Sequence, residues 1–174
     1  MTKTLYLLRH AKSSWSDSAL SDFDRPLNKR GKKAREHMAS YMAQNGHIPD
    51  LIICSTARRA VMTLKALRPM VGSACRIVMD EGLYMADPKG LANRIENIDK
   101  DIASVMLIGH NPGFQMLALS LAEPSSRTEY DRLQFKFPTA ALCILEIDQS
   151  TWGPLAPRSF QLSDFVLPRE LSEL

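Results

Sequence analysis

The sequence predicts an α/β protein, a three-layer α/β/α sandwich in which helices cover both faces of a mostly parallel central sheet. Short apolar runs typical of buried strands alternate with amphipathic segments of helical period along the chain. Polar residues follow three of these runs directly, at positions 9–14, 55–59 and 109–113. Because ligands bind at the carboxyl ends of strands in open parallel sheets, these positions indicate one shared crevice.

Length and composition are those of an ordinary globular chain. We expect residues 1–174 to form a single domain, because no linker, repeat or low-complexity tract divides them. A formal net charge of +3 is too small to indicate nucleic-acid binding. The chain has no run of about 18 apolar residues and no secretory signal pattern. We therefore expect a cytoplasmic protein that binds neither nucleic acid nor membranes.

The cysteines show no metal-site or redox-motif spacing. Cys54, Cys75 and Cys143 are far apart and lie in or beside apolar runs. We expect all three to be buried and reduced, and the sequence indicates neither a metal nor a cofactor.

The chain begins with a strand, a loop and a helix. Residues 5–8 are predicted to form a buried strand, and the Ser- and Asp-rich residues 15–26 form a loop beyond its carboxyl end. Asn28 is a plausible N-cap for a helix that continues until Gly46 ends it. A second strand at residues 51–54 then completes a βαβ unit.

A second crossover follows. The residues from about 57 to 71 carry one apolar helical stripe, and residues 76–79 form a short strand. Asp87 followed by proline is typical of an N-cap and a first helical residue. The next strand is predicted at residues 104–109.

The last part of the chain closes the sheet. A helix is predicted over residues 111–122, because its first two residues, Asn-Pro, repeat the cap-plus-proline pattern. The pattern over residues 123–136 is weak and polar and predicts no element. Residues 141–147 and 158–166 are the predicted closing strands.

The residues at the strand ends fit attack on a phosphoryl group. His10 and His110 follow separate strands, with Arg9 beside the first and Arg58 and Arg59 beyond another. A neutral imidazole can form a phosphohistidine intermediate when its other ring nitrogen is held by a hydrogen bond. Guanidinium groups and the free N–H groups of a helix start stabilise phosphoryl oxygens. This arrangement requires no metal.

The same residues resemble the motifs of a known family. Residues 8–11, Leu-Arg-His-Ala, resemble the Arg-His-Gly signature of the histidine phosphatase superfamily, and the Ser, Arg, Ala and Thr within residues 55–63 resemble its second motif. Residues 109–111, Gly-His-Asn, resemble the third. Together with Asp-Arg-Pro-Leu at 24–27, residues 3–170 are similar to the SixA-type phosphohistidine phosphatases. The resemblance implies a phosphoglycerate-mutase-like form of the predicted fold.

The resemblance also implies roles for the matching residues. It makes His10 the nucleophile and makes Arg9 and Arg59 a clamp for the phosphoryl group, while His110 donates to that group from the far side. All four residues are thus implied to bind phosphate. The register of the second motif selects Arg59, since it lies four residues after the motif serine, and leaves Arg58 as a surface residue.

The proton donor stays open between three alternatives. Many relatives place an acidic residue after the third strand to protonate an alkoxide leaving group, and Glu81 stands there, with Tyr84 three residues later. Asp24 is the second candidate. A phosphorylated imidazole leaves more easily than an alkoxide, so cleavage of a P–N bond can proceed with a weak acid or none. A further departure from the motif is Ala11 in place of its glycine, which we expect the site to accommodate.

We therefore expect a metal-independent phosphatase that acts on phosphohistidine in a protein of the histidine-containing phosphotransfer type and releases inorganic phosphate. The short segment between Thr63 and Ser104 leaves little room for a cap, and an open crevice admits a protein surface. The alternative is a small-molecule phosphomonoesterase of the same superfamily. A phosphoglycerate mutase fits less well, because the enclosing insertions are not visible. A non-catalytic phosphate-binding module does not need a nucleophile at His10.

Overall fold

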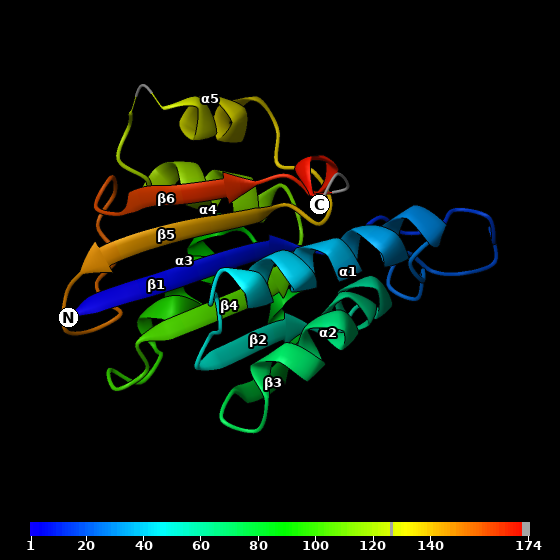
Figure 1. Ribbon diagram of the computed structural model, residues 1–174, viewed down its shortest axis with the longest axis horizontal. Helices are drawn as coiled ribbons and strands as arrows, with labels where there is room; N and C mark the ends of the chain where they lie inside the picture. The colour runs from blue at the N-terminus through cyan, green and yellow to red at the C-terminus, as the bar shows by residue number, and fades with distance from the viewer. Residues whose placement is uncertain (126, 172–174) are drawn as a thin grey trace.

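The computed structural model describes residues 1–125 and 127–171. Within these residues, six strands form one sheet in the order β3-β2-β4-β1-β5-β6 (Figure 1). The strands are β1 (Thr2–Arg9), β2 (Leu51–Ser55), β3 (Arg76–Asp80), β4 (Ser104–Gly109), β5 (Leu142–Asp148) and β6 (Gln161–Val166). Strands β3, β2, β4 and β1 are parallel, and β5 is antiparallel to its neighbours β1 and β6. The predicted mostly parallel sheet is confirmed.

Helices cover both faces of this sheet. They are α1 (Lys29–Gln44), α2 (Arg58–Val71), α3 (Pro88–Glu96), α4 (Gly113–Leu121) and α5 (Thr128–Phe135), with two short 3₁₀ helices, η1 (Glu81–Leu83) and η2 (Pro168–Glu170). Figure 1 shows α1 and α2 in front of the sheet and α3 and α4 behind it. The three-layer arrangement predicted from the sequence is therefore confirmed.

The central strands alternate between two apolar cores. In β1, Leu5 and Leu7 pack with α3 and α4 on one face, while Tyr6 and Leu8 pack with α1 and α2 on the other. All four side chains are buried. Because successive side chains of a strand point to opposite faces, the part of a strand that is covered on both faces is mostly apolar, as residues 5–8 of β1 are. Burial of this kind stabilises the fold by about 1.5–3 kcal/mol for each large side chain.

Two of the predicted N-caps, Asn28 before α1 and Asp87 before α3, are formed in the structure. Asn28 Oδ1 accepts a hydrogen bond from the Gly31 N–H at 2.8 Å, and α1 begins at the next residue. Asp87 Oδ1 accepts one from the Gly90 N–H at 2.7 Å, with proline at the first position of α3. These bonds satisfy backbone donors that a helix start otherwise leaves open.

The predicted start of the fourth helix is wrong. Helix α4 begins at Gly113, Pro112 occupies the N-cap position, and the Asn111–Pro112 peptide bond is cis. Asn111 Oδ1 accepts from the N–H of Gln115, the third residue of α4, at 3.3 Å, so it satisfies a first-turn donor from a position before the N-cap. The cap-plus-proline pattern failed here because the proline precedes the helix rather than forming its first turn.

Helix α5 is an element that the sequence pattern did not predict. Tyr130 and Leu133 are its buried residues, so its apolar stripe is too narrow to stand out among polar neighbours. The last strand is shorter than predicted. It begins at Gln161: Arg158 adopts a positive φ of 56°, and the backbone of Phe160 bonds to Leu121 and Glu123 instead of pairing with β5.

Cys54, Cys75 and Cys143 are buried and form no disulfide, as predicted.

Among the described residues, no helix has both the length and the apolar character that a bilayer crossing needs.

A close backbone approach fixes α1 against the segment that follows β1. The Asn28 N–H donates to the Lys12 carbonyl at 3.0 Å. A Cβ atom on Gly31 would lie 2.1 Å from that same carbonyl oxygen, so only glycine fits this position. The contact holds the start of α1 next to residues 10–12 at the end of β1.

We expect Gly31→Ala to lower the free energy of unfolding by about 1–3 kcal/mol, the usual cost of overpacking. Urea unfolding followed by fluorescence of the buried Trp152 measures this change. The control is Lys32→Ala at the next, exposed position, which we expect to stay within about 0.5 kcal/mol of wild type. Without the close contact, alanine would instead stabilise the helix by up to about 1 kcal/mol, and that result would refute the packing argument.

Candidate active site

The two predicted site histidines lie side by side because their strands are neighbours. Arg9 at the end of β1 pairs with Gly109 at the end of β4, and the His10 N–H donates to the Gly109 carbonyl at 3.0 Å. The imidazole rings of His10 and His110 are consequently 5.1 Å apart between centroids. Both side chains are buried.

His10 presents one ring nitrogen toward the other site residues. Its Nδ1 lies 2.8 Å from the Ala11 carbonyl oxygen, which can only accept, so Nδ1 carries the proton. The opposite nitrogen, Nε2, keeps its lone pair and accepts from Arg59 Nε at 3.2 Å. Burial lowers the pKa of His10 to about 3, helped by the charges of nearby histidine and arginine side chains and opposed by the bond to Ala11. The imidazole is therefore neutral near pH 7.

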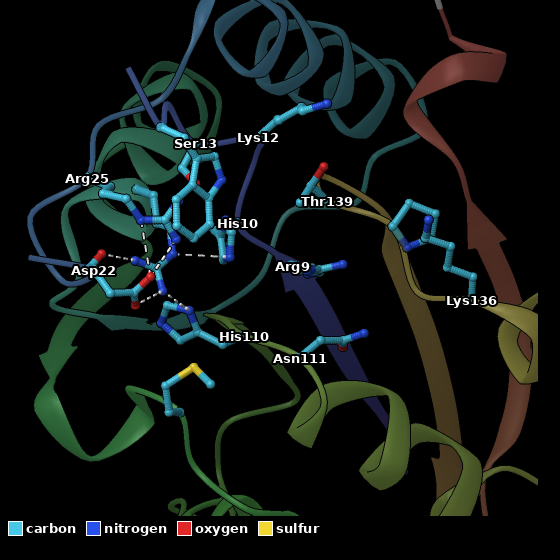
Figure 2. A pocket seen from close by; sticks show the side chains of 14 residues that line it. Arg9, His10, Lys12, Ser13, Asp22, Arg25, His110, Asn111, Lys136 and Thr139 are labelled. Carbon is cyan, nitrogen blue, oxygen red and sulfur yellow. Dashed lines mark hydrogen bonds and ion pairs between the residues drawn. The ribbon is translucent and has the colours of Figure 1, made fainter. Parts of the chain in front are cut away.

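Arg59 connects the elements of the site. It lies in the first turn of α2 and is only 3% exposed. Besides the bond to His10, its Nη1 donates to the Asp22 carbonyl at 2.6 Å and its Nη2 to Asp22 Oδ2 at 3.0 Å. Nη2 also lies 3.4 Å from His110 Nδ1. Figure 2 marks these bonds with dashed lines that end at the labelled side chains of His10, Asp22 and His110.

Thr63 fixes α2 to the end of β1. Its hydroxyl donates to the Arg59 carbonyl at 2.7 Å and accepts from the Ala11 N–H at 3.0 Å. Ala11 is fully buried and does not adopt the positive φ that favours glycine. The expectation that alanine can replace the motif glycine is therefore confirmed.

Ser55 orients the second histidine. Its hydroxyl lies 2.8 Å from His110 Nε2, and both groups are buried. A serine hydroxyl can donate or accept, so it stabilises either tautomer of the ring. Burial and the charge of Arg59 lower the pKa of His110 to about 4. This second imidazole is also neutral near pH 7.

Arg9 keeps part of its donor capacity unused. Its Nη1 donates to the Phe137 carbonyl at 2.7 Å, while its buried Nε has no hydrogen-bond partner among the described residues. Burial and then the charge of Arg59 lower the Arg9 pKa from its usual value. Two guanidinium groups close enough to repel each other favour an anion between them.

Asp22 is a site residue that the sequence analysis did not identify. Apart from its bonds to Arg59, Oδ2 accepts from the Tyr84 hydroxyl at 2.7 Å and Oδ1 from Arg25 Nε at 3.1 Å. Partial burial raises the pKa of Asp22, but the bonds from Tyr84 and Arg25 and the charge of Arg59 outweigh it and hold that pKa below its usual range. Asp22 is therefore ionised near pH 7.

Arg25 and Trp15 form the wall next to Asp22. The Arg25 guanidinium carbon lies 3.4 Å from the centroid of the Trp15 ring, and Nη1 donates to the Ser13 hydroxyl at 2.9 Å. Ser13 and Arg25 are buried, while Trp15 is 76% exposed. Arg25 belongs to the Asp-Arg-Pro-Leu segment that carries part of the family resemblance. That segment could have indicated Arg25 as a site residue.

These residues surround a cavity of about 600 Å³. Figure 2 shows its walls. The cavity is lined by Arg9, His10, Lys12, Ser13, Trp15, Asp22, Arg25, Arg59, Met85, His110, Asn111, Lys136, Pro138 and Thr139. The lining has five Lys or Arg side chains and one carboxylate, that of Asp22. Such a cavity attracts an anion.

The structure does not bring the two candidate acids into this cavity. Glu81 is exposed on η1, and Asp24 is exposed and accepts from the Ser21 hydroxyl at 2.6 Å. Neither lines the cavity. Arg58 is also exposed, as predicted. Within the described residues, no group of three or more His, Cys, Asp and Glu side chains is arranged to hold a metal ion.

Comparison with known proteins agrees with this geometry. Residues 5–86 match the model of the histidine phosphatase superfamily, branch 1. An uncharacterized protein of Mycobacterium tuberculosis is 30% identical over 93% of this chain and 100% of its own length. The chain belongs to the histidine phosphatase superfamily.

Two solved structures share the whole architecture. The candidate phosphohistidine phosphatase SixA of Agrobacterium tumefaciens is 30% identical, with a TM-score of 0.78 over 95% of this chain and 98% of that one. The corresponding protein of Nakamurella multipartita is 25% identical, with a TM-score of 0.81 over 97% of each chain. The phosphoglycerate-mutase-like fold implied by the sequence resemblance is thereby confirmed.

We expect both site imidazoles to stay neutral between pH 5 and pH 8. Their lowered pKa values, about 3 and about 4, place protonation below this range, whereas an ordinary histidine protonates near pH 6.5. Imidazole nitrogen shifts measured by NMR, assigned with His10→Gln and His110→Gln, test this expectation. A midpoint near pH 6.5 for either ring would contradict the burial argument.

The lowered pKa values of His10 and His110 also make the folding stability depend on pH. Below about pH 6.5 the unfolded chain binds protons at these histidines while the folded chain does not, so folding stability falls as the pH decreases toward 4. We expect the two glutamine variants to show a weaker dependence over this range in urea unfolding.

Proposed function

We propose that this protein is a phosphatase that removes the phosphoryl group from phosphohistidine in a protein of the histidine-containing phosphotransfer type. The covalent intermediate forms on His10. The observation that carries the proposal is the hydrogen bond from His10 Nδ1 to the Ala11 carbonyl, which leaves the Nε2 lone pair facing Arg59 inside the cavity. A neutral, oriented imidazole is the form that attacks phosphorus.

The first step transfers the phosphoryl group to the enzyme. The Nε2 lone pair of His10 forms a bond to phosphorus while the P–N bond of the substrate breaks. The electron pair of that bond returns to the substrate imidazole, which leaves as the neutral ring because its other nitrogen already carries a proton. His10 becomes a phosphoimidazolium, and its Nδ1–H still donates to the Ala11 carbonyl.

The second step releases inorganic phosphate. Water attacks phosphorus, the bond to His10 Nε2 breaks with its electrons returning to the ring, and both water protons stay on phosphate oxygens, which gives dihydrogen phosphate. His10 returns to its neutral form. The balance of both steps needs no metal, oxidant or further reactant.

The surrounding donors stabilise the charge on the phosphoryl oxygens. Arg9 has an unused buried Nε–H, and Arg59 can exchange its bond to His10 Nε2 for a phosphoryl oxygen. Once Arg59 Nη2 donates to a phosphoryl oxygen instead of His110 Nδ1, the Ser55 hydroxyl can donate to His110 Nε2 and leave the proton of that ring on Nδ1. Fixed donors around a developing charge are the largest single contribution in many enzymes.

The absence of a suitable acid among the lining residues favours a P–N substrate. Asp22 is the one carboxylate that lines the cavity within the described residues, and its low pKa keeps it from donating a proton. The Tyr84 hydroxyl donates to Asp22 instead. An alkoxide needs protonation as it leaves, while an imidazole does not, so a phosphomonoester is the poorer substrate for this site.

We expect His10→Ala to lower phosphate release from a phosphorylated histidine-containing phosphotransfer protein by at least about 10³-fold, because the nucleophile is gone. The matched control is His47→Ala, a histidine between α1 and β2 that does not line the cavity, which we expect to keep wild-type turnover. A phosphoryl-enzyme that is labile in acid and stable in base is expected with wild type and the control variant, and not with His10→Ala.

Parallel assays with p-nitrophenyl phosphate separate the two substrate classes. Faster turnover of this ester than of the phosphoprotein would favour the small-molecule phosphomonoesterase. Equal activity of His10→Ala and wild type would refute the mechanism.

We expect Ser55→Ala to lower kcat by about 10-fold with little change in KM, because His110 loses the hydrogen bond that orients its ring. Thr56→Ala is the control, since it removes a neighbouring hydroxyl that has no hydrogen-bond partner among the described residues. Steady-state kinetics of both variants give the comparison. Equal effects of the two substitutions would assign Ser55 to packing only.

A further inference from the structure

The cavity continues into two hollows on the side away from Asp22. One has a volume of about 410 Å³ and the other about 380 Å³. Both share Thr139 with the cavity, and each shares one lysine with it, Lys136 and Lys12 respectively. Figure 2 shows Thr139 and Lys136 on the opposite side of the cavity from Asp22. The hollows therefore extend the site along the surface.

Positive charge dominates this surface. Lys12, Arg30, Lys33 and Lys136, here called the basic rim, are exposed. None of the four forms an ion pair within residues 1–125 and 127–171. No carboxylate lines either hollow in that part of the chain. Carboxylates within the described residues therefore do not neutralise the positive charges of the basic rim.

The placement of Arg30 costs helix stability. Arg30 lies in the first turn of α1, where the helix dipole is positive, and that turn contains no acidic residue. Cations at this end destabilise a helix by a few tenths to about 1 kcal/mol each. A bound anionic surface would offset that cost.

Exposed aromatic side chains flank the charges. Phe135 lines the larger hollow and is 89% exposed, and Trp15 lines the cavity and is 76% exposed. Aromatic anchors surrounded by polar residues are typical of protein interfaces. A small phosphate ester held at His10 would leave the hollows beside Arg30 and Phe135 empty, whereas a protein surface would cover them.

We propose that the basic rim and Phe135 dock an acidic face of the phosphoprotein substrate, so that its phosphohistidine enters the cavity at His10. This inference rests on the proposed function and adds the chemistry of the partner surface. Opposite charges steer the encounter, so the rim raises the association rate and makes it sensitive to salt.

The test compares two double charge reversals on the same helix. Arg30→Glu with Lys33→Glu changes the rim, and Lys29→Glu with Lys32→Glu makes a similar change at exposed positions that do not line the hollows. For an acidic phosphotransfer protein phosphorylated on histidine, we expect kcat/KM to fall by about 10-fold or more in the rim pair and by less than about twofold in the control pair at low salt. Salt at about 0.5 M should shrink the difference.

Two further substrates distinguish a failure of the proposed function from a failure of the docking proposal alone. Both pairs should hydrolyse phosphoramidate at wild-type rates, and replacing carboxylates around the phosphohistidine with amides should abolish the effect of the rim pair. If wild type hydrolyses phosphoramidate but not the phosphoprotein, the proposed function fails and the docking proposal with it. If the phosphoprotein is hydrolysed and the two pairs behave alike, only the docking proposal is overturned.

Discussion

The buried guanidinium of Arg59 is the constraint on which the site depends. A buried cation is costly unless its donors are satisfied. Here His10, His110 and Asp22 surround the group, and each belongs to a different part of the chain. Burial is the main cause that keeps both histidines neutral, and the charge of Arg59 adds to it. The bonds of Arg59 to Asp22 also hold the loop after β1 against the site.

Much of the fold and part of the site could be predicted, because they follow from local patterns. The apolar runs that became β1, β2 and β4 are buried on both faces, so they contain almost no polar residue that would obscure them. Parallel pairing then places the residues after β1 and β4 together. The parallel pairing of β1 with β4 is enough to explain why His10 and His110 are adjacent.

Residues whose role depends on long-range contacts could not be found in this way. Asp22 lies in a loop of many Ser and Asp residues, and its bonds to Arg59, Tyr84 and Arg25 distinguish it from Asp24. Glu81 matched a position in the family pattern, yet its side chain is exposed on a 3₁₀ turn outside the cavity. Helix α5 was missed because its buried stripe is too narrow.

The buried cysteines have a consequence for oxidative conditions. Burial raises the pKa of the Cys54 thiol to about 12 and that of Cys143 further, so the reactive thiolate is almost absent near neutral pH. Peroxide attacks thiolates, and the proposed nucleophile is an imidazole. The folded protein should therefore keep working in an oxidising medium that inactivates phosphatases built on a catalytic cysteine.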